Sequence, residues 1–242
     1  MIISTSNAIK NNTPVLTAGS ISSGSLLDML SPDFSKVVST ASTTLTFTVG
    51  AVVGCDYIGL HGLQLPQGSN ITVSAAGYTD TFITVNATDR NVVFYVGDVS
   101  LDNLQVSITG SGTKTISYMQ AGSATVVPWG TDAGQSLYYL GYNSKNRTGT
   151  NNMGAPVIRT QEAISPRLKL NIKNVTKTWA RDDLRSIFNH YQSDGILSIL
   201  DYENDDRFNE SVAGFNLTGG DVKTHSQTLL LCDVSLTMQV SV

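Results

Sequence analysis

Charged residues are scarce in this sequence. Of its 242 residues, 14% are Asp, Glu, Lys or Arg, against about a quarter in a typical soluble domain. The net charge is −4, and no stretch concentrates Lys and Arg, which argues against nucleic-acid binding. Apolar runs such as Leu229–Leu231 are far shorter than the roughly 20 residues that span a bilayer. We therefore expect no nucleic-acid partner and no membrane span.

Residues that commonly bind metals or carry catalysis are also few. The three histidines (His61, His190 and His225) are isolated, and no zinc-binding, Gly-rich phosphate-binding or Gly-x-Ser-x-Gly motif is present. We expect no metal site, no cofactor and no enzymatic activity; a hydrolase with two carboxylates distant in sequence stays as the enzymatic alternative. Cys55 and Cys232 either form a disulfide or are two small buried hydrophobic residues, and their apolar, strand-like surroundings favour the second.

Ser, Thr, Asn and Gly supply most of the polarity, a composition typical of strands and tight turns. Apolar residues alternate with threonines from Leu45 to Val49, which indicates a half-buried strand. Further short apolar segments recur up to Met119 at spacings of roughly 8–12 residues, as in a β-sandwich or barrel. No long helical pattern interrupts them, so a parallel α/β sheet is disfavoured.

The later part of the chain repeats the strand pattern and adds a helix. Residues 167–173 alternate cleanly between polar and apolar, which predicts a strand with one solvated face. Residues 179–192 carry an apolar stripe at helical spacing, with Thr178 as the expected N-cap and Gly195 as the expected end.

The predicted fold class is therefore all-β, with two β-sandwich or jelly-roll-like domains, the second carrying one α-helix. The expected organisation is an extended N-terminal arm, a first sandwich, a Gly/Asn/Tyr-rich linker or loop, and a second sandwich-like domain with the helix, at residues 1–25, 26–128, 129–156 and 157–242.

Two groups of residues are candidate assembly or ligand contacts. The first consists of aromatic residues in or beside the linker: Trp129, Tyr138, Tyr139 and Tyr142. Aromatic residues in a long loop either contact a partner or cover the edge of a core. The second is an acidic stretch with Asp201, Glu203, Asp205 and Asp206. It lacks the spacing of a Ca²⁺-binding loop, and a solvated hairpin tip is the commoner arrangement.

Two stretches carry a resemblance to known families. The run "CDYIGLHGLQL" at residues 55–65, followed by "NITV" at 70–73, resembles the core strands of discoidin-like (galactose-binding-like) jelly rolls of phage virion proteins. The second stretch is residues 168–199, where a strand is followed by "NVTKTWARDDLRSIFNHY" and then by "GILSILDY". It is similar to the strand–helix–strand of distal-tail and minor-tail proteins of tailed bacteriophages. The resemblance implies a β-sandwich fold and a place in a phage tail or neck.

Together these patterns predict a structural protein of a phage particle that acts through protein–protein contacts. Its expected partners are other copies of itself and other virion proteins, in a symmetric ring or spike. Its expected location is the virion, after assembly in the cytoplasm of the bacterial host. The alternative is a carbohydrate-binding module or adhesin that recognises a host surface glycan through aromatic residues such as Tyr78 or Trp129.

Overall fold

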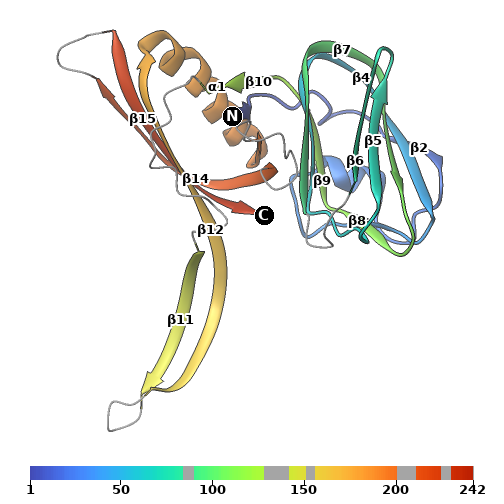
Figure 1. Ribbon diagram of the computed structural model, residues 1–242, viewed down its shortest axis with the longest axis horizontal. Coiled ribbons are helices and arrows are strands. Elements are labelled where there is room, and N and C mark those ends of the chain that lie inside the picture. Colours follow the sequence, from blue (N-terminus) through green and yellow to red (C-terminus); the bar gives the residue numbers. More distant parts are fainter. Residues whose placement is uncertain (84–89, 128–141, 151–155, 201–210, 225–229, 242) are drawn as a thin grey trace. The chain divides into compact units, whose positions relative to one another are not determined.

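A computed structural model describes residues 1–83, 90–127, 142–150, 156–200, 211–224 and 230–241. Antiparallel strands dominate it, which confirms the all-β, β-sandwich fold class (Figure 1). The strands are β1 (Ile2–Ser4), β2 (Val15–Ala18), β3 (Val38–Thr40), β4 (Thr44–His61), β5 (Asn70–Ala75), β6 (Tyr78–Ile83), β7 (Asn91–Thr109), β8 (Lys114–Ile116), β9 (Tyr118–Gly122), β10 (Ala124–Val126), β11 (Tyr142–Thr150), β12 (Pro156–Thr176), β13 (Leu197–Leu200), β14 (Ser211–Thr224) and β15 (Leu231–Ser241). The described helices are the 3-10 turn η1 (Leu26–Leu30) and the α-helix α1 (Lys177–Asp194).

The chain forms two compact units. Unit 1 comprises Met1–Val127 and Arg181–Ala213, and unit 2 comprises Pro128–Ala180 and Gly214–Ser241. These boundaries differ from the expected ones, because most of α1 and all of β13 belong with the N-terminal residues rather than with the domain expected at 157–242.

The N-terminal residues of unit 1 form strands where the sequence suggested an extended arm. β1 pairs antiparallel with both β10 and β13, and β2 pairs with β4. Ile2, Ile3 and Ile9 are buried. Burial of three large apolar side chains offsets the conformational entropy lost when a terminus is ordered.

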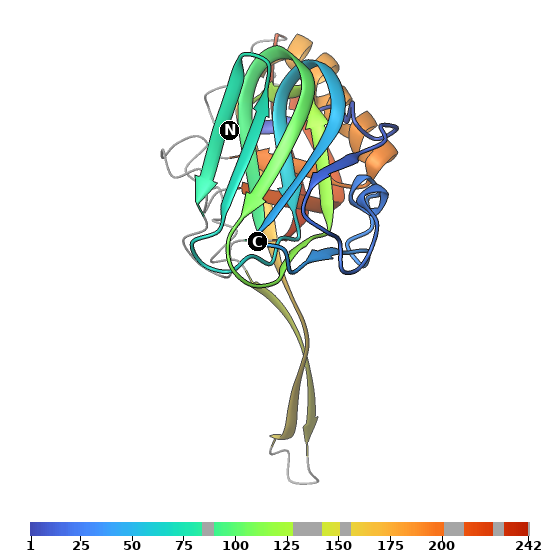
Figure 2. The ribbon, with the colours of Figure 1, turned by 90° about the vertical axis from the view of Figure 1, so that its right-hand side faces the viewer.

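The main sheet of unit 1 has the strand order β2-β4-β7-β5-β6, with β9 also paired to β4. Figure 2 shows its strands side by side. Leu45, Phe47 and Val49 of β4 are fully buried, so the alternation in the sequence marks the core-facing side of this strand, as predicted.

Gly110 and Gly112 have the chemistry of a hairpin turn, yet the strands on either side do not pair with each other. β7 pairs with β4 and β5, while β8 pairs with β3. The turn therefore leads from one sheet to another. Lys114 of β8 is buried, and its ammonium donates to the carbonyls of Ser42 and Gly112 at 2.7 and 3.1 Å.

The strands of unit 2 follow one another in the order β14-β15-β12-β11. Leu168, Leu170 and Ile172 of β12 are buried while Lys169 and Lys173 are exposed. The prediction of one apolar and one solvated face at residues 167–173 is confirmed for the side chains from 168 on. β15 shows the same alternation, with Val234, Leu236, Met238 and Val240 buried.

α1 occupies Lys177–Asp194 and thus contains the predicted helix 179–192. Thr176, not the expected Thr178, caps it, because the Trp179 N–H donates to Thr176 Oγ1 at 3.1 Å. Gly195 has φ +71° and donates its N–H to the Tyr191 carbonyl, so it ends the helix as predicted. Within the described residues, no helix combines the length and apolar character that crossing a bilayer requires.

Cys55 and Cys232 are both buried and free, which confirms the interpretation favoured by the sequence. Burial raises the pKa of the Cys55 thiol to about 12, so this cysteine behaves as a small apolar side chain rather than as a nucleophile.

Candidate functional site

The predicted contact residues lie mostly outside the described part of the chain. This holds for Trp129, Tyr138 and Tyr139, and for the acidic residues Asp201, Glu203, Asp205 and Asp206. Tyr142 is the first residue of β11, and only its backbone is described. Their roles as contacts therefore remain predictions.

The structure instead brings together two groups of buried polar residues in unit 1. The first, the serine–histidine cluster, consists of Ser198, His61 and Asn91 from β13, β4 and β7. His61 Nε2 lies 2.6 Å from Ser198 Oγ, and His61 Nδ1 lies 3.1 Å from Asn91 Oδ1. Because Asn91 Oδ1 can only accept, Nδ1 carries the proton and Nε2 accepts from the serine hydroxyl. A nucleophile, a base and a group that orients the base thus stand in the order found in serine hydrolases.

Burial argues against catalysis at this cluster. His61, Ser198 and Asn91 are at most 2% exposed. Desolvation lowers the pKa of His61 to about 4, although its hydrogen bond with Asn91 acts in the opposite direction. The backbone also crowds the serine: a Cβ on Gly59 would lie 2.4 Å from Ser198 Oγ and 2.8 Å from His61 Nε2. A substrate carbonyl therefore has no space beside Ser198 Oγ in this packing.

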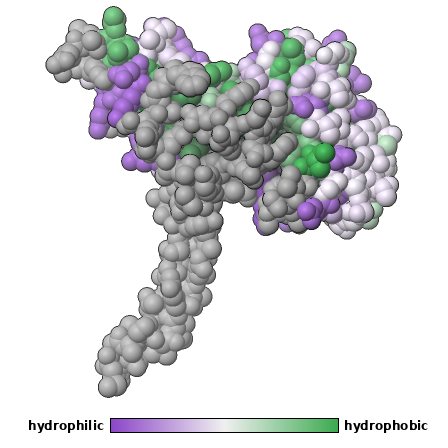
Figure 3. Space-filling model, in the orientation of Figure 1, coloured by the Kyte–Doolittle hydropathy of each residue, from purple (hydrophilic) through white to green (hydrophobic). Residues whose placement is uncertain are grey.

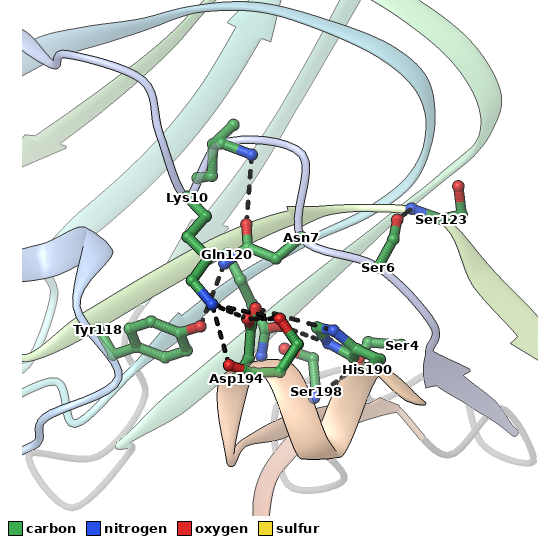
Figure 4. A network of polar contacts seen from close by, with 12 residues as sticks. Ser4, Ser6, Asn7, Lys10, Tyr118, Gln120, Ser123, His190, Asp194 and Ser198 are labelled. Atoms are coloured by element: carbon green, nitrogen blue, oxygen red, sulfur yellow. Dashed lines mark hydrogen bonds and ion pairs between the residues drawn. The ribbon is translucent and has the colours of Figure 1, made fainter. Parts of the chain in front are cut away.

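The second group, the lysine–aspartate cluster, surrounds the end of α1 (Figure 4). Lys10 Nζ donates to Asp194 Oδ1 at 2.6 Å, and His190 Nδ1 lies 3.7 Å from Asp194 Oδ2. On the other side of the imidazole, His190 Nε2 lies 3.1 Å from Gln120 Oε1, which also faces the Tyr57 hydroxyl at 2.8 Å. The Asp194 side chain is 2% exposed, whereas that of Lys10 is 36% exposed.

The electrostatics of this cluster depend on the Asp194 charge. Gln120 Oε1 can only accept, so His190 Nε2 carries the proton in the neutral ring and Nδ1 faces Asp194 with a lone pair. Burial, and secondarily Lys10, lower the pKa of His190, while Asp194 raises it. Asp194 Oδ2 and Gln120 Nε2 are buried without a hydrogen-bond partner among the described residues. Asp194 thus depends on Lys10 for its charge partner.

Both clusters tie distant segments of unit 1 together. Ser198 is 137 positions from His61 in sequence, and Asp194 is 184 positions from Lys10. Buried polar groups that satisfy one another fix a single arrangement, because every alternative leaves some unpaired. Sequence reasoning missed both clusters; the available signals were His190 and Asp194, four residues apart beside the apolar stripe of α1, and His61 inside an apolar strand.

A third feature is the ribbon formed by β11 and the first half of β12 in unit 2. β12 pairs with β11 along Pro156–Pro166, and it pairs with β15 only from Arg167 onward. Among the described strands, β11 has no other neighbour. Figure 1 shows the two strands running away from β14 and β15 as an isolated pair. At about 3.4 Å per residue, the nine residues of β11 extend about 30 Å.

Unit 1 also has a shallow polar hollow of about 390 Å³, which we call the sandwich hollow. It is lined by Ser74, Ala75, Ala76, Asp102, Asn103 and Gln105. Tyr78, which is half-buried, stands opposite Ala75 in the β5–β6 pair. The described residues contain no group of three or more His, Cys, Asp or Glu side chains that could hold a metal ion.

Comparisons with known proteins find no matching family model and no matching curated protein. Solved structures with a distant likeness include a fucose-binding module of Streptococcus pneumoniae, with 9% identity, coverage of 49% of this chain and 98% of that one, and a TM-score of 0.39. The lectin domain of lectinolysin, solved with Lewis B antigen, is 9% identical over 48% of this chain and 94% of its own, with a TM-score of 0.38. None of these likenesses places the chain in a family.

Proposed function

We propose that this protein is a non-enzymatic structural component of a multi-protein particle and that it assembles through its β11–β12 ribbon. The observation that carries the proposal is the pairing of this ribbon. Along Pro156–Pro166, the side of β12 opposite β11 has no partner in the described strands, and neither does the outer side of β11.

An isolated two-stranded ribbon is at best marginally stable in water. The outer edge of each of its two strands presents unpaired backbone N–H and C=O groups, which favour the addition of a strand from another chain. A ribbon of this length gains stability when a neighbouring subunit pairs with it or packs on it. We infer that the neighbour is a second copy of this chain.

Among its described residues, the face shown in Figure 3 has no broad apolar patch that would compete with the ribbon as a contact. On the face shown in Figure 3, hydrophobic residues form small, separate patches among polar ones. Such scattered residues are normal on a soluble surface and do not mark an interface. The sequence resemblance to tail proteins suggests a phage tail or neck as the particle, which would make the virion the final location of this chain.

Shortening the ribbon tests the proposal. Lys145 pairs with Ala163, so residues 146–162 can be replaced by Asn-Gly, a two-residue turn that suits antiparallel strands. We expect the full chain to form a defined oligomer in sedimentation velocity and the shortened chain to sediment as a monomer. The urea midpoint of unit 1 should be the same in both. A monomeric full chain, or equal oligomers from both chains, would contradict the proposal.

A second candidate function is glycan binding, and the sandwich hollow favours it. Its lining offers a carboxylate, two amides and a hydroxyl, the groups that pair with vicinal sugar hydroxyls. Tyr78 supplies an aromatic ring one strand away.

A glycan array tests this candidate. Binding of a host surface glycan should fall in a variant that combines Asp102→Ala with Gln105→Ala. It should persist in Asp98→Ala, which removes another exposed carboxylate of β7 outside this hollow. Binding that is equal in all three proteins would remove the sandwich hollow from consideration.

A further inference from the structure

The two edges of the β11–β12 ribbon differ in how well they can accept a further strand. Each residue of β11, from Tyr142 to Thr150, stands opposite one residue of β12. β12 is less regular, because Val157 and Glu162 fall between consecutive partners and have no opposite residue in β11. Both register shifts are therefore β-bulges of β12, and bulges twist an edge away from an incoming strand.

The prolines of the ribbon add to this difference between the edges. Pro156 and Pro166, at the two ends of the paired stretch, both belong to β12. Proline has no N–H to donate to a neighbouring strand. β11 contains neither a proline nor a bulged residue. The outer edge of β11 is therefore the one that can form an uninterrupted ladder of backbone hydrogen bonds.

A second copy of this chain supplies a matching edge for β11. Two antiparallel copies of β11 have the same length and the same regular backbone, and a two-fold contact between them occupies both edges at once. Such a contact joins two ribbons into one sheet with the order β12-β11-β11-β12. A pair of strands is at best marginally stable, and three or more are needed for independent stability.

The charges of β11 restrict how two copies can pair. Lys145 and Arg147 are its charged residues. In a two-fold antiparallel pair, one residue stands opposite itself, and the residues on either side of it stand opposite one another. A centre at residue 145, 146 or 147 places two cations directly opposite each other, which is destabilising. Among the other centres, Ser144 and Thr148 keep the most residues paired, and there each cation faces an uncharged residue.

We propose that two copies of this chain join through antiparallel β11 edges, with Ser144 or Thr148 at the two-fold centre. This inference rests on the proposed function, because it names the edge and the symmetry of the contact through which the ribbon assembles. The bulged, proline-containing edges of β12 stay on the outside of the joined sheet.

Single cysteines and a short thiol cross-linker test the edge and the centre. A cysteine at the two-fold centre faces its own copy, with the two Cβ atoms about 5 Å apart. The test variants are Ser144→Cys and Thr148→Cys, and the matched variants on β12 are Thr160→Cys and Ser165→Cys. We expect one of the two β11 variants to give at least about tenfold more cross-linked dimer than either β12 variant, because thiols link only at short range.

The native chain is the background control, because Cys55 and Cys232 are buried. Its sedimentation velocity separates the two ways in which the inference can fail. If the native chain is oligomeric but the β12 variants cross-link best, or no β11 variant exceeds the background, the β11 contact is overturned and the proposed function stands. If the native chain is monomeric, the proposed function fails and the β11 contact fails with it.

Discussion

Lowering the pH from 7 to 4 should destabilise unit 1, and His61 should cause most of the change. The His61 ring is buried, and its pKa falls from 6.5 to about 4 because burial disfavours the charged form. In the unfolded chain the ring binds a proton below about pH 6.5. The unfolded state therefore holds more protons than the folded state between about pH 6.5 and 4, and the stability falls as the pH falls through this range.

The size of the effect follows from the difference between the two pKa values. At about 1.4 kcal/mol per pH unit, a difference of about 2.5 units amounts to about 3 kcal/mol. The pKa of His190 is also lowered by burial, so this residue acts in the same direction. Asp33 and Asp182 have lowered pKa values owing to hydrogen bonds with Ser35 and Arg181. The contributions of these two aspartates to the free energy of unfolding are therefore lost at lower pH than those of the histidines.

Urea unfolding at pH 7, 6, 5 and 4, followed by circular dichroism, measures the effect. His61→Gln removes the titrating group while keeping a polar side chain. We expect the free energy of unfolding of this variant to change by about 3 kcal/mol less than that of the native chain across the range. Equal pH dependence in the two proteins would show that the His61 ring is not buried in its neutral form.

Two further predictions concern the buried clusters. Gly59→Ala should lower the free energy of unfolding by about 1–3 kcal/mol, because the added methyl meets Ser198 Oγ at 2.4 Å. Adding Ser198→Ala to this variant should restore part of that loss. If the effects of the two substitutions on the urea midpoint were strictly additive, the close approach of Gly59 to Ser198 Oγ would be refuted. Lys10→Met should cost about 2 kcal/mol, because it leaves the buried Asp194 carboxylate without its ammonium partner. Lys36→Met, at an exposed lysine, should cost under about 0.5 kcal/mol, and similar losses in both variants would contradict the role of Lys10.

Features of the fold that depend on local periodicity could be predicted from the sequence. Leu45, Phe47 and Val49 alternate with threonines because one face of β4 is buried. Leu184 and Ile187 repeat at helical spacing because α1 buries one stripe. Both patterns are visible within a few consecutive residues, so predicting these elements required no knowledge of tertiary contacts.

Features of the fold that depend on partners distant in sequence could not be predicted from the sequence. β1 has only three residues, and its neighbours β10 and β13 lie more than a hundred positions away. The glycines at residues 110 and 112 have the chemistry of a hairpin turn, but the pairing of β8 with β3 decides the topology. Ser198 and His61 share no local motif, because their contact exists only when β13 lies beside β4.

Sedimentation of a lysate tests whether this chain acts as an assembled component through its ribbon. Cells that produce the particle are lysed, the lysate is separated on a density gradient, and each fraction is searched for peptides of this chain by mass spectrometry. We predict that the full chain travels with particles of many megadaltons, whereas a tagged copy with the shortened ribbon stays at the top. A full chain found only at the top, as a small protein, would show that it is not a component of such a particle.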